Sequence, residues 1–265
     1  MTKLFSSSNK SPCVSVVVIT NNRLALLKET LTSILSQTFT DFELIVVDNM
    51  SIDGTSDYLN GFGDDRIRYF RNPNNGIIAV NRNYGIAYAV GKYIAFCDDD
   101  DLWFPNKLKL QVSLLEQHPA VALCYTNAES FFDNKTIAKQ MVRRVVRKNH
   151  FLQLLRGNFI PNSSVLIRRN IFFELGLLTE DSRLREDYEM CLRIANCHRL
   201  MGIDLSLIRY RIHLGNVAGN KANETLRAIR TVKSVTGLLN IPIYLSVPNV
   251  WFQYLKYIVY RMVSR

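Results

Sequence analysis

The chain has 265 residues, of which 48% are hydrophobic and 21% charged, enough to bury the core of one large domain. Its five cysteines include no CxxC pair, so the sequence indicates neither a disulfide framework nor a zinc site, and we expect a reducing, cytoplasmic environment. The polar N-terminal segment and the lack of any long uncharged apolar run predict neither a secretory signal nor a membrane-spanning helix.

The net charge of +10 is unevenly distributed along the chain. Residues 1–140 carry 13 basic and 15 acidic side chains, a net charge of −2, whereas residues 141–265 carry 20 basic and 8 acidic ones, a net charge of +12. A basic half of this kind suits an anionic membrane, a phosphorylated substrate or nucleic acid. Because the chain contains no RNP, zinc-finger or P-loop signature, we do not predict a nucleic-acid partner.

The first hundred residues alternate between strand and helix patterns. Val14–Ile19 is a β-branched run, and Leu24–Leu35 places apolar residues at helical spacing. Continuously apolar strands that alternate with helices are typical of a parallel sheet covered by helices on both faces. The other expected elements of this part are strands over Phe42–Val47, Ile67–Phe70 and Tyr93–Cys97, and helices over Thr55–Leu59 and Ile78–Val90.

The second half mixes strand and helix patterns less regularly, without an internal repeat or a linker that would divide the chain. Together the two halves predict an α/β fold with a Rossmann-like, mostly parallel central sheet. The expected elements are helices over Asn106–Glu116, Ile171–Leu175 and Glu186–Ile194, strands over Val121–Thr126, Ser163–Ile167 and Leu205–Ile208, and a loop with a strand over Asp133–Lys148.

Four consecutive aspartates, Asp98 to Asp101, follow the apolar run Tyr93–Cys97. Ligands bind at the carboxyl ends of strands in open α/β sheets, and hard cations such as Mg²⁺ prefer oxygen ligands. Adjacent carboxylates repel one another unless a cation or a donor network neutralises them. Two interpretations therefore stay open on these residues alone: a metal site, or an acidic loop whose last aspartate caps the following helix.

A series of short motifs runs through most of the chain in a fixed order. The motifs are Val14–Arg23, Ser33–Phe39, Glu43–Asp48, Asn75-Gly76, Asn81–Ile86, Gly91–Phe96, the aspartate run with Trp103, Asn162–Ile167 and Arg185–Glu189. Each motif is modest by itself, but their order and spacing over about residues 14–215 are specific. In both respects the chain resembles the family-2 glycosyltransferases, of the kind that build bacterial polysaccharides such as O-antigen.

This resemblance implies a GT-A fold, a nucleoside-diphosphate sugar as donor, Mn²⁺ or Mg²⁺ as cofactor, and inversion at the anomeric carbon. The acceptor would be a hydroxyl of a glycan or of a lipid-linked sugar. The resemblance implies a GT-A domain over residues 12–215, with a nucleotide-sugar and metal half (12–126) and an acceptor half (127–215). Residues 216–265 would form a C-terminal helical extension.

The resemblance assigns Asp100 and Asp98 to the metal, with His213 as a further ligand if it is not an ordinary surface or core residue. A bound cation would stabilise the charge that develops on the diphosphate as the sugar departs. Donor contacts are implied for the residues at the ends of the first, second and fourth strands and in the helix before the fourth. These residues are Thr20, Asn22, Asp48, Asn49, Arg82, Asp98 and Asp99.

Alternatives stay open for several of these donor contacts. Thr20 and Asn22 are also common turn formers. Asn21 and Asn49 replace the aromatic and acidic residues usual in the family, so UDP- and dTDP-linked sugars are both allowed. The guanidinium of Arg82 suits a phosphate, although an arginine on a helix is often simply solvated.

The resemblance places the catalytic base at Asp187, near the start of the helix over Glu186–Ile194. An inverting transfer needs one carboxylate to accept the proton of the attacking hydroxyl. Acidic residues are also favoured at a helix N-terminus by the helix dipole, which is the structural alternative. Glu186 and Trp103 would either orient the acceptor or pack against the catalytic groups without contacting substrate.

The C-terminal segment Ile241–Arg265 lies outside the resemblance. An aromatic and aliphatic face that includes Trp251 and Leu255 is paired with a basic face that includes Lys256 and Arg261. Such a helix either lies on the anionic inner face of the cell membrane or packs on its own domain. For the whole chain, the alternatives to a glycosyltransferase are a non-catalytic carbohydrate-binding or scaffold relative, and a sugar nucleotidyltransferase.

Overall fold

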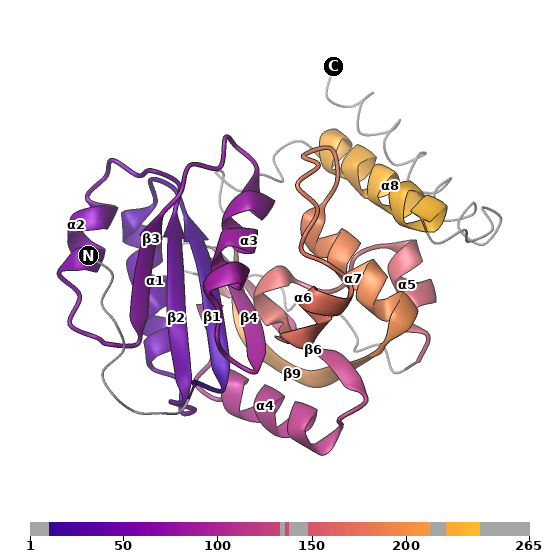
Figure 1. Ribbon diagram of the computed structural model, residues 1–265, viewed down its shortest axis with the longest axis horizontal. Helices are drawn as coiled ribbons and strands as arrows, with labels where there is room; N and C mark the ends of the chain where they lie inside the picture. The colour runs from indigo at the N-terminus through magenta and orange to yellow at the C-terminus, as the bar shows by residue number, and fades with distance from the viewer. Residues whose placement is uncertain (1–10, 133–135, 138–147, 213–220, 239–265) are drawn as a thin grey trace.

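The computed structural model describes residues 11–132, 136–137, 148–212 and 221–238 (Figure 1). One mixed β-sheet runs through the molecule in the order β3-β2-β1-β4-β8-β6-β9-β5, and β7 pairs with β6 beside this path. Strands β3, β2, β1 and β4 are parallel to one another, whereas β8 is antiparallel to both β4 and β6. The predicted α/β fold with a mostly parallel central sheet is confirmed.

The N-terminal half follows the strand and helix alternation of its sequence. Strands β1, β2 and β4 are almost continuously apolar because both of their faces are covered, as expected for a parallel sheet. Every predicted element of this half is present, with ends that differ by at most a few residues from the prediction. The elements are β1 (Val14–Thr20), α1 (Leu24–Leu35), β2 (Phe42–Asp48), α2 (Thr55–Asn60), β3 (Ile67–Arg71), α3 (Ile78–Tyr88) and β4 (Tyr93–Asp98).

The C-terminal half departs more from the prediction. The predicted strand over Ser163–Ile167 is wrong at its start, because a 3₁₀ turn precedes the strand there, and β9 is much longer than predicted. Helix α5 was not predicted. The elements are β5 (Leu102–Trp103), α4 (Lys107–Gln117), β6 (Val121–Phe132), β7 (Thr136–Ile137), α5 (His150–Arg156), η1 (Asn162–Ser164), β8 (Leu166–Arg168), α6 (Asn170–Glu174), α7 (Glu186–Cys197), β9 (Arg199–Ile212) and α8 (Lys221–Leu238).

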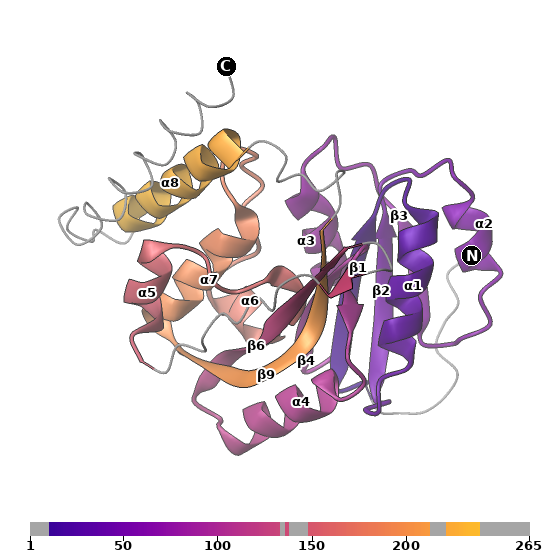
Figure 2. The same cartoon turned by 180° about the vertical axis from the view of Figure 1, so that it is seen from behind.

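Helices cover the sheet on both faces, and a separate apolar core fills each side. Along β1, Val17 belongs to the core under α3, α6 and α7, whereas Val16 and Val18 belong to the core under α1 and α4. The first group of helices lies in front of the sheet in Figure 1, and α1 is seen in front of it in the reverse view of Figure 2. The predicted arrangement of helices on both faces is confirmed.

Helix α3 packs closely on the sheet at Gly85, which faces β1. A Cβ atom at this position would lie 2.5 Å from Cγ1 of Val17, closer than side chains can pack. The glycine therefore sets the distance between α3 and β1. The same helix carries Arg82, so this contact also sets how far Arg82 stands from the end of β4.

Helix α8, the described part of the predicted C-terminal extension, packs on the molecule. Its Val232 and Val235 belong to the core that α7 also covers, and α7 and α8 lie side by side in both ribbon views (Figures 1 and 2). The backbone N–H of Arg185 donates a hydrogen bond to Oγ1 of Thr231, 2.9 Å away. The predicted tail helix over Ile241–Arg265 lies outside the described residues.

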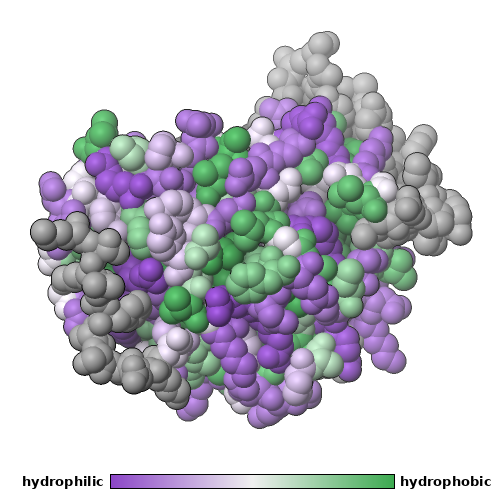
Figure 3. All heavy atoms as spheres, viewed as in Figure 1, coloured by the Kyte–Doolittle hydropathy of each residue, from purple (hydrophilic) through white to green (hydrophobic). Residues whose placement is uncertain are grey.

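Hydrophilic residues dominate the face shown in Figure 3, and hydrophobic ones gather near its centre. The large apolar side chains that remain exposed on the molecule include Phe173 and Leu177. Within the part of the chain that the structure describes, every helix is too short or too polar to cross a lipid bilayer.

Candidate functional site

The carboxyl ends of β1, β2 and β4 meet at one edge of the sheet. The parallel register pairs Thr20 with Asp48 and Ile19 with Asp98, so the polar residues that end these strands lie at the same level. A cavity of about 440 Å³ opens at this edge, between the sheet and the helices of the C-terminal half. Eight predicted site residues line it: Thr20, Asn49, Arg82, Asp98, Asp99, Asp100, Glu186 and Asp187.

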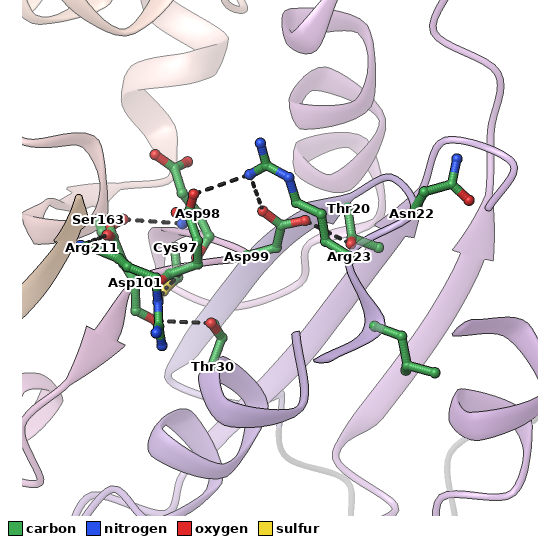
Figure 4. A network of polar contacts seen from close by, with 12 residues as sticks. Thr20, Asn22, Arg23, Thr30, Cys97, Asp98, Asp99, Asp101, Ser163 and Arg211 are labelled. Carbon is green, nitrogen blue, oxygen red and sulfur yellow. Dashed lines mark hydrogen bonds and ion pairs between the residues drawn. The ribbon is translucent and has the colours of Figure 1, made fainter. Parts of the chain in front are cut away.

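The aspartate run is held by donors from several elements, as Figure 4 shows. Oδ2 of Asp99 accepts a hydrogen bond from Oγ1 of Thr20 at 2.7 Å. Nη1 of Arg23 contacts both Asp99 and Asp100, at 3.1 and 3.0 Å. Burial raises the pKa of Asp99 to about 6, although Thr20 and Arg23 act in the opposite direction. Arg23 therefore neutralises part of the charge that four adjacent carboxylates bring together.

Asp101, the last residue of the run, is buried beneath the cavity. Its carboxylate accepts hydrogen bonds from Oγ of Ser163 at 2.5 Å and from the backbone N–H of Arg211 at 3.1 Å. Its carbonyl accepts one from Oγ1 of Thr30. Burial raises the pKa of Asp101 well above its usual range, and the charges of Asp98 and Asp100 add to that rise. Asp101 therefore anchors the loop that carries the three aspartates lining the cavity.

Arg82 joins the two halves of the site. Its guanidinium donates to Oδ1 of Asp98 at 2.7 Å and also forms an ion pair with Glu186. Burial alone would lower the pKa of Arg82, but the adjacent Asp98 and Glu186 raise it. Nδ2 of Asn162 donates a second hydrogen bond to Oδ1 of Asp98, at 3.0 Å. The orientation of the Asp98 carboxylate is therefore determined by two donors from different elements.

Asp187 lies in the first turn of α7 and faces the cavity from the C-terminal half. Nδ2 of Asn158 donates a hydrogen bond to its Oδ2 at 3.3 Å, and Nη2 of Arg185 lies 3.9 Å from the same oxygen. Burial raises the pKa of the adjacent Glu186, while Arg82 lowers it. Carboxylates from the first turn of α7 and from the end of β4 therefore line the same cavity.

Of the four remaining predicted site residues, three do not line the cavity and the fourth lies outside the described residues. Asp48 is fully buried, where it accepts hydrogen bonds from Ser51 and from Tyr69. Oδ1 of Asn22 accepts a hydrogen bond from the backbone of Ile52, and its side chain stands apart from the aspartates in Figure 4. The two others are Trp103, which is buried and donates to the carbonyl of Ser163, and His213, which lies outside the described residues.

The sequence did not single out several residues that line the cavity. Arg23 lies three residues after the end of the first strand, and its position close to Thr20 and Asn22 was a usable signal. Tertiary packing brings the others to the same edge, and the sequence gave a signal only for the two that open motifs, Asn162 and Arg185. The others are Asn162, Arg185, Tyr210, Glu224 and Arg227, the last two from α8.

The carboxylates that line the cavity form only part of a site for the implied metal. No group of three or more His, Cys, Asp or Glu side chains among the described residues is arranged to hold a metal ion by itself. Cations such as Mg²⁺ are usually bound by one or two carboxylates together with substrate phosphates and water. Asp98 and Asp100, which both line the cavity, provide that kind of partial site. The residues present therefore fit a cation that a diphosphate ligand helps to hold.

Comparison with protein families gives a match over residues 15–176 to the model described as glycosyl transferase family 2. This match covers more than half of the chain and includes β1, the aspartate run and η1. The chain belongs to glycosyl transferase family 2. The family and the enzyme class predicted from the ordered motifs are thereby confirmed.

Two curated proteins illustrate the range of similar family-2 glycosyltransferases. An uncharacterized glycosyltransferase of Rickettsia felis is 31% identical over 232 residues, which are 87% of this chain but 36% of the relative. The chain thus spans about a third of that relative. A UDP-Glc:alpha-D-GlcNAc-diphosphoundecaprenol beta-1,3-glucosyltransferase of Escherichia coli, WfgD, is 29% identical over 216 residues, 81% of this chain and 83% of the relative.

Two solved structures share the fold. S. aureus TarS 1–349 in complex with UDP-GlcNAc has a TM-score of 0.69 and 18% identity, covering 84% of this chain and 66% of that one. The mannosyltransferase PcManGT from Pyrobaculum calidifontis, in complex with GDP-Man and Mn²⁺, has a TM-score of 0.64 and 17% identity, covering 92% and 74%. These likenesses confirm the predicted GT-A fold of the family-2 chain.

Proposed function

We propose that this family-2 glycosyltransferase moves a sugar from a UDP-linked donor to a hydroxyl group of a lipid-linked sugar, with inversion at the anomeric carbon. The observation that carries the proposal is that Asp187 shares one cavity with Asp98 and Asp100, from the opposite side. The UDP and undecaprenol-linked substrates named for similar proteins support the choice of donor and acceptor.

The donor would occupy the sheet edge, with its nucleoside at the ends of β1 and β2. Thr20 and Asn49 line the cavity there, whereas Asp48 would act through its hydrogen bonds to Ser51 and Tyr69. The diphosphate would lie beside Asp98 and Asp100, which would hold Mn²⁺ or Mg²⁺. When bound, such a cation would neutralise the charge that develops on the departing diphosphate.

Arg82 and Glu186 would act as a positioning pair. Arg82 holds Asp98 through a 2.7 Å hydrogen bond and holds Glu186 on its other side, so it connects the metal-binding carboxylate with the turn that carries Asp187. Because Asp98, Arg82 and Glu186 are linked, the distance between the Asp98 carboxylate and the turn that carries Asp187 is determined before substrate binds.

Asp187 would accept the proton of the attacking hydroxyl. The acceptor oxygen then forms a bond to the anomeric carbon while the bond from that carbon to the diphosphate breaks, and the nucleoside diphosphate leaves with the electron pair. A single displacement of this kind inverts the anomeric configuration. General-base catalysis contributes about 10²–10⁴-fold to rate, which sets the loss expected when the base is removed.

The test is transfer from UDP-Glc to N-acetylglucosaminyl diphosphate bearing a short alkyl chain, with Mn²⁺ or Mg²⁺. The wild type should form a product with the β linkage, and Asp187→Asn should lower kcat by about 10²–10⁴-fold with little change in UDP affinity. Asp181→Asn is the control, because Asp181 pairs with Arg183 outside the cavity lining. Equal activity of Asp187→Asn and wild type would remove Asp187 from the role of base.

A further inference from the structure

An arginine beside the proposed base has no hydrogen bond from its side chain to any residue that the structure describes. Arg185 directly precedes α7, lines the cavity and leaves 33% of its side chain exposed. Its closest carboxylates are Asp187, 3.9 Å from Nη2, and Glu224, 3.7 Å from Nε, both beyond hydrogen-bond distance. By contrast, Arg82 donates to Asp98 at 2.7 Å. The guanidinium of Arg185 can therefore donate hydrogen bonds to a ligand in the cavity, whereas that of Arg82 already donates to Asp98.

Helix α8 brings a second guanidinium to the same place. Arg227 also lines the cavity and donates to Oε1 of Glu224 at 3.0 Å and to the carbonyl of Leu184 at 2.7 Å. Its Nε is buried, and within the described residues no acceptor lies within hydrogen-bond distance of it. A buried donor without a partner is costly, so a ligand that supplies an acceptor there would be favoured.

The two arginines stand on the acceptor side of the site. Arg185 lies two residues before Asp187, and Arg227 is 3.8 Å from Glu186, whereas Thr20 and Asp98 line the cavity from the ends of β1 and β4. The base must contact the accepting hydroxyl, so groups next to it face the acceptor. In a sugar phosphate, only the width of a sugar ring separates such a hydroxyl from the phosphate.

We infer that Arg185, assisted by Arg227, binds a phosphate group carried by the acceptor and thereby selects acceptors whose accepting sugar is attached to a phosphate or diphosphate. This inference rests on the proposed function. A planar guanidinium donates two parallel hydrogen bonds to a phosphate, which suits it to recognise that group.

The test compares two acceptors in the full-length protein. One is N-acetylglucosaminyl diphosphate with a short alkyl chain, and the other is the uncharged alkyl N-acetylglucosaminide with a chain of equal length. Wild type should prefer the charged acceptor, and Arg185→Gln should lower the ratio of the two kcat/KM values by about tenfold or more. Arg185→Lys keeps the charge but loses the planar fork, so its ratio should fall between the two.

Arg183→Gln is the matched control, because Arg183 is 74% exposed, pairs with Asp181 and lies just upstream on the same segment. UDP affinity, measured by calorimetry, shows whether the arginines bind the diphosphate of the donor instead of that of the acceptor. A lower ratio at unchanged UDP affinity supports the inference. An unchanged ratio overturns it, and so does a lower ratio with weaker UDP binding, which assigns Arg185 to the donor.

The wild-type measurements separate this inference from the proposed function. Transfer to both acceptors with equal kcat/KM overturns the acceptor-phosphate site alone and leaves the proposed function standing. Absence of transfer to either acceptor, from any nucleotide sugar, overturns the proposed function and the acceptor-phosphate site with it. Thermal unfolding midpoints of the Arg185 variants, compared with wild type, separate a loss of fold from a loss of recognition.

Discussion

Replacing the buried Lys107 should change the way in which stability depends on pH. Lys107 is fully buried at the start of α4, behind the aspartate run. Its Nζ donates to Oε1 of Gln111 at 2.8 Å and lies 3.8 Å from the ring centroid of Trp103. Burial in these surroundings lowers the pKa of Lys107 from 10.5 to about 7.

The sign and size of the effect follow from that pKa. Above about pH 7 the folded chain releases the proton of Lys107, whereas the unfolded chain keeps it until about pH 10.4. The unfolded state then binds one proton more, so the free energy of unfolding rises with pH by about 1.4 kcal/mol per unit. Between about pH 7.5 and pH 9 the wild type should gain about 2 kcal/mol from this group. In Lys107→Met the gain is absent.

Urea unfolding at several pH values in this window is the assay. The free energy of unfolding of Lys107→Met minus that of the wild type should fall by about 2 kcal/mol from the lower to the higher pH. Comparing differences cancels the titration of the buried cysteines, which both proteins share. Lys109→Met is the control, because Lys109 is exposed on the same helix. A difference that stays constant with pH would refute the assignment of a neutral, buried Lys107.

Two further predictions concern the cavity itself. Arg82→Met should destabilise the fold by about 3 kcal/mol, because Asp98 and Glu186 lose their shared partner. Thermal and urea unfolding measure this loss. An unchanged free energy of unfolding would contradict the bridging role of Arg82. Asp100→Ala should abolish the part of the UDP-induced thermal shift that depends on Mn²⁺, and a shift equal to that of the wild type would remove Asp100 from the metal site.

Much of the N-terminal half could be predicted from its sequence, because the relevant interactions are local in the chain. The β-branched run that forms β1 is apolar on both faces, and the helical spacing of α1 matches its observed bounds, Leu24–Leu35. Polar residues that end parallel strands must reach the same edge of the sheet, so Thr20 and the aspartates could be placed together before the structure was known.

The composition of the cavity could be predicted only in part. Asp98, Asp100 and Asp187 line it as the motif order led us to expect, but Asn22 and Trp103 do not. Their side chains contact other groups, the backbone of Ile52 and the carbonyl of Ser163. Hydrogen-bond partners of this kind come from loops that neither propensity nor spacing describes.

Tertiary structure alone placed α8 at the site. Nothing in the spacing of Glu224 and Arg227 relates them to Asp187, and both lie after the segment that matches the family model. Burial of Val232 and Val235 against the core that α7 covers positions the helix, and its charged residues reach the cavity as a consequence. The sequence by itself determined which chemical groups end each strand. Packing between distant segments brought Arg227 beside the turn that carries Asp187, because burial of an apolar face depends on the whole assembled core.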